Sequence, residues 1–377
     1  MGKIFKNKFV IILILVVLFF FFGSITNTLV LNNRGIVVGM GLDVDNEGRV
    51  VLNCQILVAG EVGAEGEEND NYAILSASGD TFGEAVQNMM VDSAEFMSFA
   101  HCNSIIVGKT MAESGKLYTI LDELLKNSKI TENTNLVYYE GESSEMLKQK
   151  VGINLMASFA IQRMIALSKG YVDVAKCTIK DYLTGVNAVG GCVVMPEVVV
   201  SEKIDEAIGS DQGKGRVILS LKGGACVTDS AVSGRLSQQE VGFYNMVKKD
   251  FKLGIFSMAT RDGSVSVEFR DKSRKFEYEV DSLTTTCKVD ARIVESLLIN
   301  DTQGRDEDEK DVLEENFENG VKDGITSLYE RFRDIGIDVY GVYGGYKKKV
   351  GKDFTKTHSK FNEKFILKVE VNADLAP

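Results

Sequence analysis

Histidine, tryptophan and proline are the residues that this 377-residue sequence has least of. It contains two histidines, His101 and His358, two prolines and no tryptophan. So few histidines exclude most histidine-based metal sites, and a Ser/His/Asp hydrolase would depend on one of these two residues. Two prolines against 36 glycines indicate turns built on glycine rather than rigid proline-rich linkers.

Close cysteine pairs are absent as well. The six cysteines follow one another without a CxxC or CxxxC spacing: Cys54, Cys102, Cys177, Cys192, Cys226 and Cys287. Zinc ribbons and thioredoxin-like sites need such pairs, so the spacing excludes both. Because Cys54 lies within the apolar stretch 50–58, we expect most of these cysteines to be buried thiols that act as small hydrophobic side chains.

Positive charge is in the minority. The chain has 43 Lys and Arg against 54 Asp and Glu, which gives a net charge of −11 at pH 7. An acidic surface repels phosphate backbones, so we expect no nucleic-acid partner. A hydrophobic content of 44% still offers enough apolar surface for a folded core, and the length suggests two or three domains.

The N-terminus carries an export pattern. Three lysines precede an unbroken apolar run, Phe9–Phe22, which matches the hydrophobic region of a signal sequence. Extension to Leu31 reaches the length of a membrane-spanning helix, and no A-x-A cleavage motif follows the run. Lysines before the run place the N-terminus in the cytoplasm and the body outside. We therefore expect residues 1–31 to be a signal anchor that holds the protein in the lipid bilayer through residues 9–31.

Strand and helix patterns alternate in the first half of the body. Gly35–Asp43 and Arg49–Ala59 bracket a short Asp/Asn/Gly segment, which predicts a β-hairpin. The acidic segment Glu61–Asp70 is typical of a solvated loop. Thr81 and Glu84 have the spacing of a capping box at the start of a helix. Further strands and helices are expected at Asn103–Val107, Leu117–Leu125 and Asn135–Tyr139, within Ser143–Leu183, and at Cys192–Val200.

Strands dominate beyond Ser210–Gly215, a loop-like segment where we place a domain boundary. They are expected at Val217–Leu221, Ala225–Thr228, Ser264–Phe269, Lys275–Val280, Thr284–Val289, Ile337–Tyr340 and Phe365–Val371. A long helix is expected after the charged segment Arg305–Asp311, with an apolar stripe of Val312, Phe317, Val321, Ile325, Leu328 and Phe332. These patterns predict an α+β, multi-domain protein with mixed sheets, each packed with helices.

Two short motifs in the hairpin invite a ligand-binding interpretation. Asp43 and Asp45 could hold a divalent cation, but a single carboxylate pair is a weak signal, and we expect both to be exposed turn residues. Gly39 and Gly41 lack the third glycine of a dinucleotide loop and lie within a strand, so they favour a bulge or close packing.

Two other clusters also have a structural explanation. His101 next to Cys102 could form a thiol nucleophile, but neighbours on a strand point to opposite faces. The basic cluster Lys347–Lys360 could meet anionic lipid headgroups or an acidic partner, although a solvated loop explains it too. No catalytic, cofactor-binding or metal-ligating residue is assigned, and no cofactor is expected.

Several segments together have the order and spacing of a known family. They are Arg34–Asp43 with Gln55, Thr81–Ala85, His101–Gly108, Met111–Ala112, Leu121–Asp122, Ile130–Leu136, Gly224–Val227, Gly234–Leu236, Glu240–Gly242, and the long helix leading into Ile337–Gly341. In this order they resemble the Ger(x)C family, the C subunits of bacterial spore germinant receptors. The chain departs from the family at its anchor, because no lipobox cysteine follows the apolar run.

The resemblance implies a non-enzymatic receptor subunit that assembles with the membrane-embedded A and B subunits at the outer face of the inner spore membrane. It also implies three α/β subdomains. We expect a signal anchor at 1–31, an N-terminal region at 32–207 that splits near residue 143, and a C-terminal domain at 213–377. The alternative function is an exported, membrane-anchored solute-binding protein or hydrolase unrelated to germination. Co-purification with a polytopic membrane partner would favour the first, and turnover or a tightly bound small molecule the second.

Overall fold

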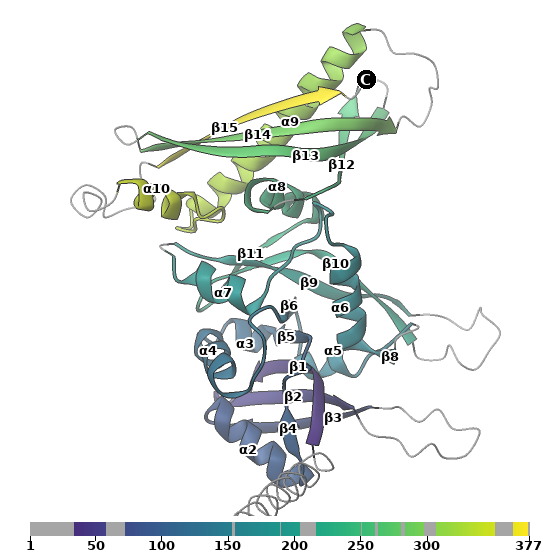
Figure 1. The fold of residues 1–377 in the computed structure, drawn as a ribbon, viewed down its shortest axis with the longest axis vertical. Coiled ribbons are helices and arrows are strands. Elements are labelled where there is room, and N and C mark those ends of the chain that lie inside the picture. The colour runs from purple at the N-terminus through teal and green to yellow at the C-terminus, as the bar shows by residue number, and fades with distance from the viewer. Residues whose placement is uncertain are drawn as a thin grey trace, which may run out of the picture.

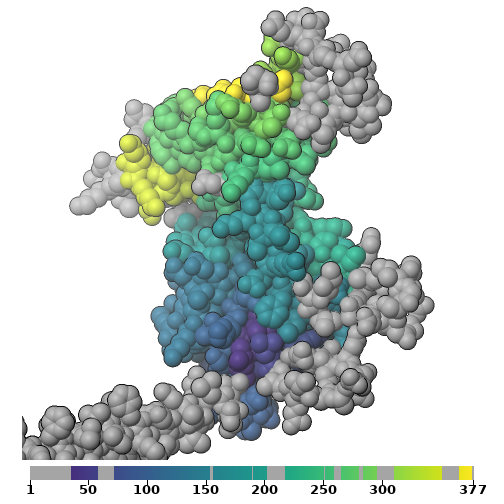
Figure 2. Space-filling view, turned by 45° about the vertical axis from the view of Figure 1, so that its right-hand side comes forward, coloured from purple at the N-terminus to yellow at the C-terminus, as the bar shows by residue number. Residues whose placement is uncertain are grey.

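A computed structural model describes most of the body of the protein. It covers residues 34–57, 72–152, 155–188, 190–203, 216–249, 251–260, 263–279, 283–297, 307–350 and 365–375. The body is elongated, with α2 and β4 at one end and the sheet β12–β15 at the other (Figure 1). The space-filling view shows the same order, from purple and blue to green and yellow (Figure 2). Within these ranges, none of the helices is long and apolar enough to cross a membrane; the expected anchor, residues 1–31, lies outside them.

The elements follow one another in this order. The first part contains β1 (Arg34–Val44), β2 (Val50–Leu57), β3 (Tyr72–Gly79), α2 (Phe82–Ser93), β4 (Phe96–Ser98), β5 (Ser104–Gly108), α3 (Lys109–Ala112), α4 (Leu117–Asn127), β6 (Asn135–Tyr139) and α5 (Ser143–Leu147). The middle part contains β7 (Lys150–Val151), β8 (Leu155–Met156), α6 (Ala157–Leu167), α7 (Ile179–Val186), β9 (Val193–Lys203), β10 (Arg216–Val227) and β11 (Val232–Leu236). The last part contains α8 (Gln238–Lys248), β12 (Gly254–Thr260), β13 (Gly263–Glu279), β14 (Thr284–Leu297), α9 (Glu307–Arg333), α10 (Val342–Val350) and β15 (Ile366–Leu375).

The predicted hairpin is confirmed as β1 and β2, which pair antiparallel with a bulge between Val37 and Gly39. The sheet continues in the order β3-β2-β1-β5-β6, and β5 pairs parallel with both β1 and β6. The acidic segment 61–70, between β2 and β3, lies outside the described residues. Thr81 caps α2 by accepting the Glu84 backbone N–H, while the Glu84 carboxylate accepts the N–H of Asp80 instead of that of Thr81.

The two faces of this first sheet differ in composition because side chains alternate along a strand. Met40, Leu42, Leu52 and Cys54 belong to the core that also contains the apolar sides of α2 and α4. The opposite face bears glycines and polar residues where α5 and α6 contact the sheet, beside a second core built around Ile161. On this face, Asp43 and Gln55 of the sheet contact the first turns of α5 and α6.

A single sheet continues from the first part into the middle part. Tyr138 of β6 forms a bridge with Glu197 of β9, and β9 pairs antiparallel with β10. The expected boundary at 210–215 lies outside the described residues, between β9 and β10. The division into regions 32–207 and 213–377 therefore stays a proposal.

The last part is built on the sheet β12-β13-β14-β15, in which β15 runs parallel to β14. Its core brings one side of the sheet together with α8, α9 and α10, and contains the tilted or edge-on ring pairs Phe256–Phe317 and Phe269–Phe317. The long helix is confirmed as α9, and five of the six residues of its predicted stripe are buried. Val312 is the exception, with 56% of its surface exposed, and Leu313 takes the buried position instead.

Three of the strand predictions are wrong, each for a local reason. Segments 217–221 and 225–228 form one strand, β10, because a bulge at Leu221–Gly224 absorbs the glycines that resembled a turn. Segments 264–269 and 275–280 likewise merge into β13, which has a bulge between Asp271 and Ser273. Ile337–Tyr340 is a turn rather than a strand, because Asp338 lies before α10 and caps it.

All six cysteines are free and buried, which confirms that they act as apolar side chains. Burial raises the pKa of the Cys102 thiol to about 12. Such thiols are poor nucleophiles because the reactive species is the thiolate.

Asp338 makes the stability of the last part depend on pH. Its carboxylate accepts the backbone N–H groups of Val342 and Tyr343 at 3.0 and 2.8 Å, and burial, which outweighs these bonds, raises its pKa to about 6. Because the folded pKa exceeds the unfolded one, the contribution of Asp338 is full below pH 4 and decreases as the pH rises through 6. The loss amounts to about 3 kcal/mol.

Asp338→Asn should remove this pH dependence, since the amide does not titrate. Denaturant unfolding of the solubilised chain between pH 4.5 and 7.5 is the measurement. The stability difference between wild type and Asp338→Asn should change by about 2 kcal/mol over this window in favour of the variant, because part of the total loss already occurs below pH 4.5. Parallel pH profiles for the two proteins would contradict the assignment.

Candidate functional site

Asp43 is not the exposed turn residue that the sequence predicts. It is 5% exposed, at the end of β1 and on the face that meets α5. Both of its carboxylate oxygens accept the backbone N–H of Ser143, at 3.1 and 3.0 Å, and the Ser143 hydroxyl donates to Oδ2 at 2.5 Å. Because Ser143 is the first residue of α5, a side chain 100 positions earlier in the chain caps this helix.

Gln55 performs the same task for α6. Its Oε1 accepts the backbone N–H and the hydroxyl of Ser158, at 3.4 and 2.5 Å, and Ser158 lies in the first turn of α6. Its Nε2 donates to the carbonyl oxygen of Leu147, the last residue of α5, at 3.2 Å. One buried amide thus joins the end of one helix to the start of the next.

Three more side chains complete the arrangement. Asn53 donates from Nδ2 to Asp43 and to the Ser143 hydroxyl, both at 3.1 Å, and accepts from Ser76 at 2.6 Å. Ser104 of β5 donates to the carbonyl oxygen of Ser158 at 3.4 Å. We refer to the set as the junction network: Asp43, Asn53, Gln55, Ser76, Ser104, Ser143 and Ser158.

Glycines allow the two helices to approach the sheet this closely. A Cβ on Gly41 would lie 2.7 Å from the Ser143 Cβ and closer still to its hydroxyl. A Cβ on Gly39 would lie 2.9 Å from the Ser158 hydroxyl, and one on Gly108 3.0 Å from the Asp43 Cγ. These separations are well below the usual carbon–carbon contact of about 3.5–4.0 Å. The expectation of a bulge or close packing is confirmed: both glycines are closely packed, and a bulge lies between Val37 and Gly39.

The carboxyl group of Asp43 is in an unusual electrostatic environment. Burial raises its pKa above the usual range, while the two kinds of hydrogen bond from Ser143 lower it and the nearby Glu142 and Glu145 raise it again. The hydrogen bonds that the Asp43 carboxylate accepts come from Ser143, at the start of α5, and from Asn53. The junction network therefore serves to orient α5 and α6 on the sheet.

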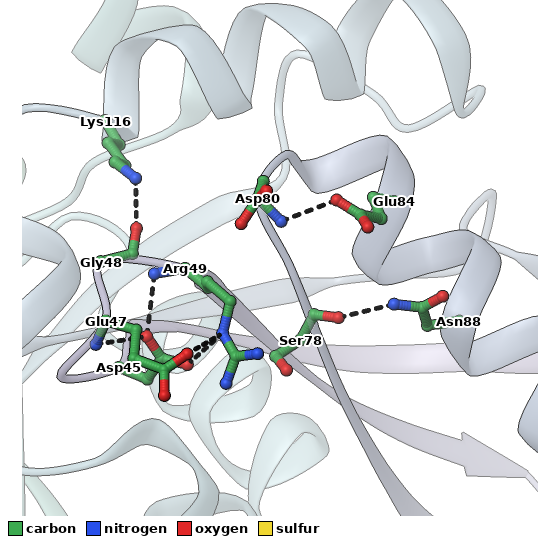
Figure 3. A network of polar contacts seen from close by, with 9 residues as sticks. All are labelled: Asp45, Glu47, Gly48, Arg49, Ser78, Asp80, Glu84, Asn88 and Lys116. Carbon is green, nitrogen blue, oxygen red and sulfur yellow. Dashed lines mark hydrogen bonds and ion pairs between the residues drawn. The ribbon is translucent and has the colours of Figure 1, made fainter.

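Asp45, the partner of Asp43 in the candidate cation pair, belongs to the turn and not to the network (Figure 3). Its Oδ1 accepts the N–H groups of Glu47 and Arg49, at 3.0 and 2.8 Å, and its Oδ2 accepts from the Arg49 guanidinium at 2.9 Å. Gly48 has a φ of +79°, and its carbonyl oxygen accepts from Lys116 (Figure 3). The two aspartates therefore have separate partners.

His101 and Cys102 are not neighbours on a strand, as the sequence suggested, because both precede β5, but they differ in burial. His101 is exposed in the turn before β5, whereas Cys102 is buried and its Sγ lies 3.5 Å from the Ser104 carbonyl oxygen. In the basic cluster, Lys347, Lys348 and Lys349 are exposed on the last turn of α10, and residues 351–360 lie outside the described part of the chain. Within the described ranges, no group of three or more His, Cys, Asp or Glu side chains could hold a metal ion.

A charged cluster lies where the first and middle parts meet. Glu140, after β6, pairs with Lys109 of α3 at 2.9 Å and with Arg235 of β11, and it accepts from the Tyr138 hydroxyl. Arg235 also lies 3.5 Å from Glu197 of β9. Partial burial raises the pKa of Glu140, but the bonds from Tyr138 and Lys109 and the charge of Arg235 outweigh it and lower the pKa. These contacts join three strands and α3.

An apolar groove of about 570 Å³ is lined by residues of α2 and β4. These two elements lie at one end of the body (Figure 1). The apolar lining of the groove is contributed by Phe82, Val86, Met90, Phe96, Met97 and Phe99. Phe96 is 68% exposed, which is unusual for a large aromatic side chain. We call this feature the end groove.

Sequence reasoning missed the junction network and the end groove. Asn53 and Gln55 are the only polar residues within the otherwise apolar strand β2. Because they are two positions apart, they lie on the same face of the sheet, and this spacing was the available signal of a polar network. Their partners Ser143 and Ser158 follow about 90 to 100 residues later, and nothing in the local sequence connects them.

Comparison with known proteins gives a consistent result. Residues 27–200 match the family model described as "Spore germination protein N-terminal domain", and residues 222–376 match "Spore germination B3/ GerAC like, C-terminal". The spore germination protein KC of Bacillus subtilis (strain 168) is 23% identical over 160 residues, which are 41% of this chain and 39% of that protein. The chain thus matches about two-fifths of the length of this relative. A crystal structure of the GerBC protein aligns with 90% of this chain and 97% of that one, at 14% identity and a TM-score of 0.49.

Proposed function

The chain belongs to the spore germination family that these two domain models define, and we propose that it is the non-enzymatic C subunit of a membrane-bound germinant receptor. The observation that carries the proposal is the occurrence of both family domains, in order, after an apolar N-terminal segment. In this function the chain contributes to nutrient-triggered germination by assembling with membrane-embedded A and B subunits.

The roles of the candidate chemical groups support a non-enzymatic subunit. Asp43 caps α5, Asp45 closes the β1–β2 turn, and Cys102 is a buried thiol, whereas His101 is exposed. Asp43, Asp45 and Cys102 are thus engaged in holding the fold. We propose that this fold presents contact surfaces to its partners.

The location we propose follows from the sequence before β1. An apolar segment at residues 9–31 would hold the chain in the bilayer, with the body on the extracytoplasmic side, as the preceding lysines indicate. In a spore this position corresponds to the outer side of the inner membrane. The division into an N-terminal region at 32–207 and a C-terminal domain at 213–377 is part of the same proposal.

Deletion of the encoding gene tests the function. Spores without the chain should lose the response to the nutrient that their receptor senses, and should keep germination by a trigger that bypasses nutrient receptors. Complementation with the intact chain should restore the response. Unchanged germination across a panel of nutrients, together with loss of a hydrolytic or solute-uptake activity, would contradict the proposal and favour the alternative function.

A further inference from the structure

We propose that the end groove, with Phe96 at its rim, contacts the lipid surface of the membrane that holds the N-terminal segment. The inference rests on the proposed anchoring through residues 9–31 and adds the surface by which the body meets the bilayer. Its occupant is the interfacial region of the lipid, which takes up apolar side chains from proteins that lie on a membrane.

The position of the groove follows from strand pairing. Strand β4 lies beside the first residues of β1 in a parallel register, with Arg34 opposite Phe96. Arg34 is three residues beyond Leu31, the end of the proposed anchor, and three residues span at most about 11 Å. Adding one strand spacing places Phe96 within about 16 Å of the end of the anchor. A short tether therefore keeps the groove next to the bilayer.

The chemistry of the groove suits an apolar environment. Phe96 is exposed at its rim, and the α2 residues Val86 and Met90 are half-buried in its lining. In water such a surface leaves apolar area uncovered, and contact with acyl chains would remove this area from water. The last part of the body, with the exposed Ile255 of β12, has no such tether to the anchor.

The charges around the groove indicate how the lipid is recognised. Asp92 and Glu95 are exposed beside Phe96, Glu123 lies in the lining, and the exposed Lys129 provides one positive charge on the rim. Attraction to anionic headgroups is not favoured by this set of charges. The contact is therefore apolar insertion, and it should not need anionic lipid.

A fluorescent reporter can test the contact in the full-length chain. Because the sequence has no tryptophan, Phe96→Trp introduces a unique indole, and Ile255→Trp provides a matched control in the last part of the body. Each variant is reconstituted into phosphatidylcholine vesicles with or without brominated acyl chains. The indole of Phe96→Trp should emit at shorter wavelength than that of Ile255→Trp, and brominated lipid should quench the first and leave the second unchanged. Met90→Trp, in the groove lining, serves as a second reporter if Phe96→Trp folds poorly.

The outcomes separate this inference from the proposed function. Vesicle-bound protein whose groove reporters are not quenched would overturn the inference and leave the anchoring intact, as expected if a protein partner covers the groove. Quenching that appears only with anionic lipid would contradict insertion by apolar contact. Failure of wild-type chain to remain with the vesicles would contradict the proposed anchoring itself.

Discussion

Gly41→Ala is expected to lower the free energy of unfolding by about 3 kcal/mol, the upper part of the range for overpacking in a close-packed interior. The new methyl group would lie 2.7 Å from the Cβ of Ser143 and 3.2 Å from Cδ1 of Leu147, so α5 would have to move off the sheet. Movement of α5 would also break the bonds between Asp43 and Ser143. The measurement is denaturant unfolding of the solubilised chain, together with its level in the membrane fraction.

Gly344→Ala is the matched control. A Cβ at this position in α10 meets nothing within 4 Å, so the same chemical change should leave stability unchanged or slightly higher. Adding Ser143→Gly to Gly41→Ala removes the two nearest atoms and should recover part of the lost stability. Equal stability of Gly41→Ala and Gly344→Ala would show that close packing at Gly41 does not hold α5 in place.

Asp43→Ala is expected to destabilise the protein by about 3–5 kcal/mol, because removal of the carboxylate leaves buried polar groups without a hydrogen-bond partner. The Ser143 N–H, the Ser143 hydroxyl and the Asn53 amide would lose their shared acceptor. Asp45→Ala changes the same residue type two positions later, in the turn, where we expect a loss of about 1 kcal/mol. Thermal and denaturant unfolding of the two variants should therefore differ clearly, and similar small losses for both would contradict the assignment.

Asp43→Asn separates shape from charge at the same position. The amide keeps an acceptor for Ser143 but does not ionise. Since the folded pKa of Asp43 is raised, its contribution in the wild type is full below the unfolded pKa and decreases as the pH rises through the folded value. The deficit of Asp43→Asn relative to wild type should therefore shrink as the pH rises from 4 towards neutrality. A deficit that grows over this range would indicate a lowered pKa.

Elements with a clear local pattern could be predicted from the sequence. The hairpin, α4, β6 and the long helix α9 each have the spacing of apolar residues that their structure requires. Helix α8 was missed because Val241–Val247 are buried on all sides, which leaves no apolar period to detect. The pair Ser237 and Glu240 forms a capping box and was the signal for its start. The strands β10 and β13 were divided because glycines and charges at a bulge resemble those of a turn.

The candidate site depends on contacts that are remote in sequence. The segment from Gly39 to Asp43 and Gln55 could be recognised as a family pattern, and the structure gives its physical meaning. Gly39 and Gly41 allow α6 and α5 to lie close to the sheet. The side chains of Asp43 and Gln55 cap α5 and α6. Asp43 was misassigned because an aspartate at the end of a strand usually belongs to the turn, as Asp45 does. Only the packing of α5 onto the sheet distinguishes the two.

Purification of the tagged chain from detergent-solubilised spore membranes tests whether it is a subunit of a membrane-bound receptor. We expect the chain to be extracted only with detergent, with its N-terminal segment uncleaved, and a multi-spanning membrane protein to accompany it at a fixed ratio. Mass spectrometry and cross-linking before extraction would identify that protein and fix the stoichiometry. Recovery of the chain alone, in the soluble fraction and without a membrane partner, would contradict the assignment as a receptor subunit.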